Sequence, residues 1–169
     1  RGDTQRIADG LHWLRMPLPM ALNHINLWLL DDGDGWIVVD TGMYTDEAKA
    51  VWERVFDDVF DGHPIKHVIA THLHPDHAGC AGWLTDVAGC DLWMTREEYL
   101  LCRVLVADTG RVAPDEGVHF YHAAGFPEKA LYNYKKMFGM FGKYGLLVIE
   151  PRDLPEEAFL PLWPLAEFL

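Results

Sequence analysis

The pattern of apolar and polar positions predicts alternating strands and helices over the first 95 residues. Two apolar runs, Ile25–Leu30 and Trp36–Val39, flank the turn-forming sequence DDGDG and predict a β-hairpin. The other strands are expected in residues 11–20, where proline then breaks the pattern, and in residues 65–71 and 90–95.

A helix is predicted from Thr45 to Phe60, with Thr45 as N-cap and two acidic residues in the first turn. Its apolar residues recur at helical spacing: Ala48, Val51, Trp52, Val55, Phe56 and Val59. A second helix is expected over residues 78–89. The resulting order of elements is typical of an α/β fold, in which functional residues lie beyond the carboxyl ends of strands. Asp40 and the segment 72–77 are both expected at such ends.

Three consecutive helices are predicted after Thr95, over residues 96–110, 114–125 and 127–142. They form either an insertion or a separate lobe. A candidate strand, Leu146–Ile149, and a strongly apolar tail follow. The chain therefore divides into residues 1–95, a helical insertion or cap over residues 96–145, and a C-terminal tail over residues 146–169.

Composition and charge exclude several classes of function. The net charge of −12 disfavours a general nucleic-acid or anionic-membrane binder, because phosphate binding needs a basic surface. No apolar run is long enough for a membrane span. The three cysteines lack CxxC spacing, which favours buried free thiols and a cytoplasmic setting.

The sequence THLHPDHAG contains the densest group of candidate metal ligands. His72, His74, Asp76 and His77 combine imidazole and carboxylate donors, which suit zinc or another borderline divalent ion such as iron or manganese. The spacing suits a loop that turns several side chains towards one point. Four donors in six residues are explained better by a pair of ions than by one tetrahedral ion. A histidine-rich surface loop is the alternative.

This motif, together with the preceding WIVVDTG, resembles the signature of the metallo-β-lactamase superfamily. The resemblance covers residues 11–95 and implies an αββα sandwich. It further implies that His72 and His74 bind a first metal, that Asp76 and His77 bind a second, and that Asp40 orients the loop.

The activity implied by the resemblance is zinc-dependent hydrolysis, in which metal-bound hydroxide attacks a carbonyl substrate such as a thioester, lactone or related ester. Asp76 would then act as a catalytic residue that orients the hydroxide or accepts its proton. The pattern is closer to the hydroxyacylglutathione-hydrolase-like branch than to true β-lactamases. A phosphodiesterase or ribonuclease of the same superfamily, and a non-catalytic metal-binding fragment acting through its apolar surface, are the alternatives.

The family pattern also requires downstream ligands that this chain does not offer in the expected context. After His77 the only histidines are His119 and His122, which are expected on one edge of an amphipathic helix. Glu150 and Asp153 follow the candidate strand without the family's Gly-Asp sequence. The sandwich is therefore expected to be incomplete, with its second half either outside this sequence or supplied by a homodimer.

The apolar tail has a corresponding interpretation, since it would cover surface that a second half covers or pack on another chain. Its large residues are Phe159, Leu160, Leu162, Trp163, Leu165, Phe168 and Leu169.

Residues outside the motif give weaker indications of substrate contacts. By the resemblance, His24 and Asn26 lie near the cleft and would contact a small-molecule substrate. A polar role at the hairpin edge is the alternative. The aromatic residues of segment 118–141 would form either an apolar wall for an acyl or aromatic substrate or, as we favour for most of them, an ordinary helix–helix core.

Overall fold

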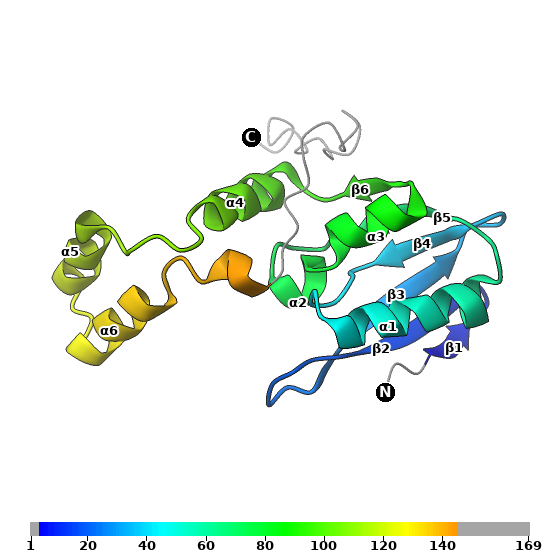
Figure 1. The fold of residues 1–169 in the computed structure, drawn as a ribbon, viewed down its shortest axis with the longest axis horizontal. Coiled ribbons are helices and arrows are strands. Elements are labelled where there is room, and N and C mark those ends of the chain that lie inside the picture. Colours follow the sequence, from blue (N-terminus) through cyan, green and yellow to red (C-terminus); the bar gives the residue numbers. More distant parts are fainter. Residues whose placement is uncertain (1–3, 145–169) are drawn as a thin grey trace, which may run out of the picture.

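The computed structural model describes residues 4–144, which are built around a single six-stranded β-sheet (Figure 1). The strands lie in chain order across the sheet: β1 (Thr4–Ala8), β2 (Leu11–Pro17), β3 (His24–Asp31), β4 (Trp36–Val39), β5 (Ile65–Ile69) and β6 (Asp91–Trp93). Strands β1 to β4 pair antiparallel, whereas β4, β5 and β6 run parallel. The predicted hairpin is β3–β4, and the candidate strand Leu146–Ile149 lies outside the described residues.

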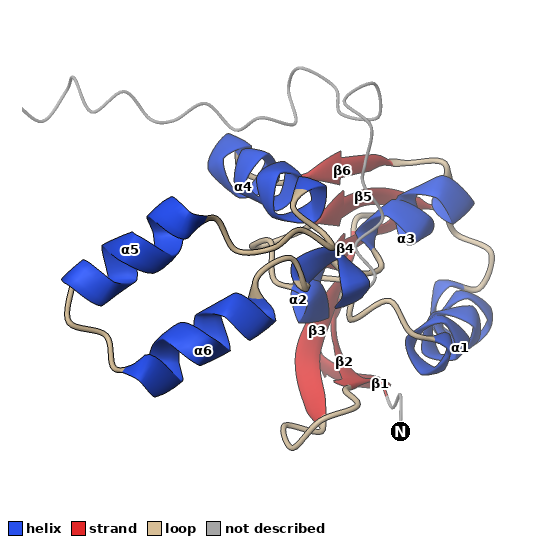
Figure 2. Cartoon of the chain, turned by 60° about the vertical axis from the view of Figure 1, so that its left-hand side comes forward, coloured by secondary structure: helices blue, strands red, loops and turns tan. Residues whose placement is uncertain are grey.

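Helices cover one face of this sheet (Figure 2). The crossover from β4 to β5 contains α1 (Asp46–Val55) and the π-helix η1 (Phe56–Phe60), and the crossover from β5 to β6 contains α2 (Pro75–Ala78) and α3 (Ala81–Ala88). The strand residues that face these helices are buried: Leu14, Met16, Leu27, Leu29, Val38, Val68 and Leu92. Burying such side chains contributes roughly 1.5–3 kcal/mol each.

Helix α1 follows its sequence pattern closely. The Thr45 hydroxyl caps the helix by accepting a hydrogen bond from the Ala48 amide at 3.1 Å. Ala48, Val51, Trp52 and Val55 are buried against the sheet. The indole Nε1 of Trp52 also donates to the Thr41 carbonyl at 2.8 Å, so α1 is tied to the turn that follows β4.

The opposite face of the sheet is apolar but lacks a second layer among residues 4–144. Strand pairing places Trp13 beside Trp28, Trp28 beside Val39, and Ile69 beside Trp93 on this face. Trp28 is 37% exposed. The described residues therefore form one helix layer and one sheet, which corresponds to half of the expected αββα sandwich.

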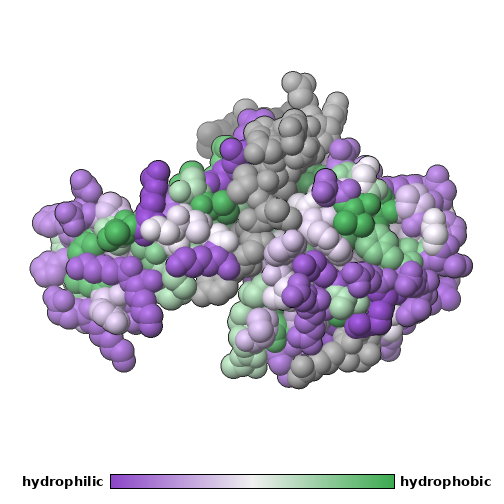
Figure 3. Space-filling model, in the orientation of Figure 1, coloured by the Kyte–Doolittle hydropathy of each residue, from purple (hydrophilic) through white to green (hydrophobic). Residues whose placement is uncertain are grey.

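After β6 the chain is helical, as predicted, and it extends away from the sheet. It forms α4 (Arg96–Ala107), α5 (Asp115–Ala123), α6 (Glu128–Met137) and the short 3₁₀ helix η2 (Phe141–Tyr144). Helices α5 and α6 form a hairpin that projects from the body (Figure 1) and shows apolar surface patches (Figure 3). None of the described helices is long and apolar enough to cross a membrane.

The helix–helix core that we favoured for segment 118–141 is only partly present. Tyr121 and Tyr134 pack between α5 and α6, with ring centroids 4.8 Å apart. However, α5 buries no residue, and Phe120 and Tyr132 are exposed. The expectation therefore holds for Tyr121 and Tyr134 but fails for the exposed residues, because the hairpin projects from the body (Figure 1).

Several elements differ from the sequence-based prediction; the helix expected over residues 127–142, for example, ends at Met137. Strand β1 was not predicted, because its sequence TQRIA lacks apolar alternation and it pairs with β2 at the sheet edge through backbone hydrogen bonds. The helix expected over residues 78–89 begins only at Ala81, after the separate turn α2. The apolar tail, like Glu150 and Asp153, lies outside the described residues.

The indole hydrogen bond of Trp52 gives a stability prediction. The substitution Trp52→Phe should lower the free energy of unfolding by about 1–3 kcal/mol, because it removes the donor to the buried Thr41 carbonyl and leaves a small void. Urea unfolding followed by circular dichroism measures this. The half-exposed Trp28 provides the control, with a loss below about 0.5 kcal/mol expected for Trp28→Phe. Equal losses in the two variants would contradict the role given to the Trp52 hydrogen bond.

The cysteines give a second prediction. Burial raises the pKa of Cys80 to about 12 and the pKa of Cys90 to about 11, and it also raises the pKa of Cys102. Because the thiolate is the reactive form, iodoacetamide at pH 8 should label the folded chain slowly and the urea-unfolded chain fully at all three positions. Mass spectrometry reads the labelling. Rapid labelling of Cys80 in the folded chain is the contrary result.

Candidate metal centre

The histidine loop lies where the parallel strands end. Strand β5 stops at Ile69, and α2 begins at Pro75, so His72 and His74 lie on the connecting loop, while Asp76 and His77 lie in the first turn of α2. Asp40 follows β4 directly, and its amide donates to the Ile69 carbonyl at 2.8 Å. The carboxyl ends of β4 and β5 thus place Asp40 beside the loop, as the sequence predicted.

Several hydrogen bonds at this edge of the sheet are accepted by the Asp40 carboxylate. It accepts from the Thr71 amide at 2.8 Å, from the Thr71 hydroxyl at 2.9 and 3.0 Å, and from His77 Nδ1 at 2.8 Å. Asp40 is 6% exposed and has a positive φ of 62°, a conformation that aspartate and asparagine adopt more readily than most residues.

These bonds also set the orientation of two imidazole rings. Since a carboxylate only accepts, His77 Nδ1 carries the hydrogen and Nε2 keeps its lone pair in the neutral ring. The single Thr71 hydroxyl hydrogen points to Asp40, so this oxygen accepts from His72 Nδ1, 3.0 Å away. His72 Nε2 is therefore also the nitrogen with the free lone pair.

The four candidate ligands lie together as two pairs of donors. His72 Nε2 is 3.0 Å from His74 Nδ1, and His77 Nε2 is 3.5 Å from Asp76 Oδ2. The His72 and His77 rings adjoin, with centroids 4.1 Å apart. Two nitrogens bound to one tetrahedral zinc ion, at its usual bond lengths, stand about 3.3 Å apart, so both pairs have a spacing compatible with shared ligation.

The electrostatics differ across the cluster. Burial, reinforced by the neighbouring His77 and His74, lowers the pKa of His72, which favours the neutral, metal-binding ring. The hydrogen bond to Asp40 raises the pKa of His77. Burial alone would raise the pKa of Asp40, but the bonds from His77 and Thr71 hold it below its ordinary value. Asp40 is therefore the fixed negative charge of the cluster.

The donor types suit a metal ion, but the ligand set is incomplete. Among residues 4–144, no group of three or more His, Cys, Asp or Glu side chains is arranged around one ion position. Each donor pair supplies two ligands, whereas zinc sites in proteins use three or four. The residues present therefore fit part of a coordination shell, and the contact between His72 and His74 would have to be replaced by bonds to the ion.

His119 and His122 do not complete the set. Both lie on α5, which is separated from α2 in both ribbon views (Figures 1 and 2). His24 and Asn26 lie on β3 and have partners on the neighbouring strand β2: His24 Nδ1 is 3.1 Å from an Arg15 guanidinium nitrogen, and Asn26 Oδ1 accepts from Trp13 Nε1 at 2.9 Å. Their contact with a substrate stays a prediction.

Sequence reasoning missed three residues that position the loop. Thr71 links Asp40 to His72, as described above. The amide and hydroxyl of Thr41 both donate to the His77 carbonyl, at 2.6 and 2.8 Å. A carboxylate oxygen of Glu98, on α4, accepts from the Leu73 amide at 2.7 Å. The sequence Thr95-x-x-Glu98 signals a capping box, but Glu98 holds the loop between the two histidines.

A close backbone approach holds α2 against the turn after β4. A Cβ atom at Gly79 would lie 2.8 Å from the Tyr44 amide and 2.9 Å from the Gly42 carbonyl, and it would also meet the Pro75 carbonyl. Only glycine therefore fits here without a backbone shift.

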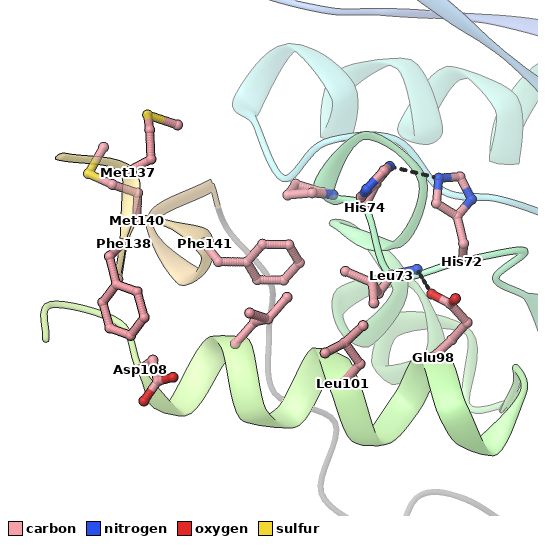
Figure 4. A pocket seen from close by; sticks show the side chains of 13 residues that line it. His72, Leu73, His74, Glu98, Leu101, Asp108, Met137, Phe138, Met140 and Phe141 are labelled. Carbon is pink, nitrogen blue, oxygen red and sulfur yellow. Dashed lines mark hydrogen bonds between the residues drawn. The ribbon is translucent and has the colours of Figure 1, made fainter. Parts of the chain in front are cut away.

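A cavity of about 660 Å³ opens beside the first donor pair (Figure 4). His72, His74 and Glu98 line one end, while the rest of the wall comes from α4 and from the segment between α6 and η2. This volume lies in the usual range for small-molecule sites.

The comparisons with known proteins agree with this arrangement. The family model of the metallo-β-lactamase superfamily matches residues 21–163. A β-lactamase domain protein from Burkholderia ambifaria is 46% identical with a TM-score of 0.58, and the match covers 63% of this chain and 34% of that one. A search of curated proteins found no significant match.

Two further structures support the fold. A metallo-β-lactamase from Erythrobacter litoralis is 25% identical with a TM-score of 0.50, over 59% of this chain and 44% of that one. The mono-zinc form of the metallo-β-lactamase FIM-1 from Pseudomonas aeruginosa is 21% identical with a TM-score of 0.50, and the match covers 60% of this chain and 45% of that one. This chain spans about a third of the length of the Burkholderia protein. The fold, the loop and the family match together identify the chain as a member of the metallo-β-lactamase superfamily.

Proposed function

We propose that this chain forms the metal-binding half of a zinc-dependent hydrolase that acts on a carbonyl substrate, such as a thioester, lactone or related ester. Membership of the superfamily implies a metal-dependent hydrolase. The observation that carries the proposal is the convergence of two donor pairs, His72 with His74 and Asp76 with His77, beside the buried Asp40 carboxylate.

Each residue has a defined task in this proposal. His72 and His74 would hold one ion, and Asp76 and His77 would hold the other. Bound zinc supplies Lewis acidity, which polarises a carbonyl oxygen and lowers the pKa of water. Asp40 fixes His77 directly and His72 through Thr71, and Asp76 would orient the attacking water or accept its proton.

The surroundings favour a carbonyl over a phosphodiester substrate. The protein has a net charge of −12, and the cavity beside His72 and His74 is lined mainly by apolar side chains. Neither feature supplies the basic groups that bind phosphate. We further propose that iron or manganese can replace zinc, that a homodimer completes the ligand set, and that the protein is cytoplasmic.

Zinc content and turnover test the proposal directly. We expect the purified protein to contain zinc by mass analysis and to hydrolyse members of a chromogenic thioester and lactone panel. A solution mass shows whether activity accompanies a dimer. Less than about half a zinc ion per chain together with no turnover contradicts the hydrolase proposal for this chain.

His74 provides the sharpest variant for metal binding. The substitution His74→Ala should abolish zinc binding in a competition assay with a chromogenic chelator, because only His72 would remain to hold the first ion. His119→Ala is the matched control, since this exposed histidine on α5 should leave the affinity unchanged. Retained zinc binding in the His74 variant would show that the loop is not the anchor.

Asp40 tests the orienting hydrogen bonds without removing a ligand. Asp40→Asn should lower the zinc affinity about 10–100-fold, because the amide cannot replace the carboxylate that accepts from His77 and Thr71. Asparagine tolerates the positive φ at this position, so the fold should survive. Asp57→Asn, at an exposed acid of η1, serves as control. Similar affinities for the Asp40 and Asp57 variants would remove Asp40 from the mechanism.

A further inference from the structure

The cavity beside the histidine loop has an uneven distribution of polar groups. Its apolar wall includes Leu73, Leu101, Met137, Phe138, Met140 and Phe141. Figure 4 shows His72, His74 and Glu98 at one end, Leu73, Leu101 and Phe141 along the middle, and Met137 and Phe138 at the far end. The cavity is therefore a hydrophobic compartment that begins at the first donor pair.

The two carboxylates in the wall already have partners. Glu98 accepts from the Leu73 amide at 2.7 Å, and Asp108 lies 3.3 Å from an Arg111 guanidinium nitrogen. Among the described residues that line the cavity, there is no Lys or Arg side chain. A ligand that extends along this cavity is therefore selected mainly by hydrophobic contact.

We propose that this cavity binds the apolar acyl group of the substrate, with the carbonyl at the His72–His74 end and the hydrocarbon chain along α4 towards Met137 and Phe138. The assignment of the bound group to a substrate rests on the proposed hydrolase function. The cavity itself is a separate observation. The methionines give the wall side chains that adapt to ligand shape, which suits a family of linear or aromatic acyl groups better than one rigid ligand.

The position of the cavity argues for a substrate group over a protein partner. Its polar end coincides with the candidate metal ligands, so an occupant that fills the apolar part has its head group beside His72 and His74. Leu101 is 49% exposed and Met137 is 55% exposed, which leaves apolar surface for the occupant to cover. Burial of this apolar surface is expected to raise the affinity for the occupant about fourfold for each methylene group that is removed from water.

Methyl NMR of the six methionines tests this without any need for zinc or turnover. The metal-free protein, labelled with carbon-13 at the methionine methyls, is titrated with butanamide, hexanamide and octanamide, which are neutral and avoid repulsion by Asp76 and Glu98. We expect the Met137 and Met140 signals to shift, with affinity rising up to about fourfold per methylene. Met20, which is 50% exposed, controls for non-specific contact, and its signal should stay in place.

A pair of neighbouring variants on α4 gives the matched comparison. Leu101→Glu places a charge in the wall and should weaken octanamide binding about tenfold or more. Leu100→Glu changes a residue of similar exposure, 54% against 49%, that does not line the cavity, and it should leave binding unchanged. Phenylpropanamide, titrated in the same way, compares an aromatic with a linear chain.

Three results would overturn the acyl site: no selective shift of Met137 and Met140, equal affinity for all three chain lengths, or equal losses in the two glutamate variants. Because the shifts are read from metal-free protein, failure of zinc binding would leave a positive result standing. Confirmed hydrolysis without these shifts would instead place the acyl group elsewhere.

Discussion

The buried Asp40 carboxylate joins the sheet to the histidine loop, and the geometry of the centre depends on it. It lies between the ends of β4 and β5 and accepts from Thr71 and His77, the residues on either side of the loop. A charged group that is only 6% exposed needs such donors, because burial without them costs several kcal/mol. The same hydrogen bonds that offset the burial of Asp40 therefore also fix which imidazole nitrogens are free to bind a metal.

Residues of the β4–β5 and β5–β6 crossovers and of α4 hold the segments around Asp40 in place. Trp52 of α1 donates to the Thr41 carbonyl, while the amide and hydroxyl of Thr41 donate to the His77 carbonyl. Gly79 lets α2 approach the turn after β4, and Glu98 of α4 holds the loop at Leu73. Hydrogen bonds thus connect the buried core around α1 to the histidine loop. Substitutions in this core are therefore expected to disturb the candidate metal centre.

The parts of the structure that could be predicted are those marked by a pattern of residues close together in the sequence. The four donors lie within six residues, and α1 repeats its apolar residues at helical spacing, so both could be recognised without the fold. Strand β1 has no such signal, because an edge strand of polar residues forms through backbone pairing with β2. The role of Glu98 depends on a contact across 25 positions, which no local sequence pattern reveals. The aromatic residues of α5 and α6 were assigned to a core because helical spacing does not reveal whether a second packing surface exists.

The one-sided sheet and the incomplete ligand set have the same physical explanation. Trp13, Trp28 and Trp93 lie on a sheet face that no described element covers, although an apolar face of this kind belongs in the interior of a sandwich. At the edge of that sheet, each donor pair lacks the further ligands that zinc requires. A second sheet packed on the open face would bury the tryptophans, and its own strand ends would reach the same edge as those of β4 and β5. One added layer, from residues beyond those described or from another chain, would therefore meet both needs, whereas a separate metal-binding loop would leave the sheet face exposed.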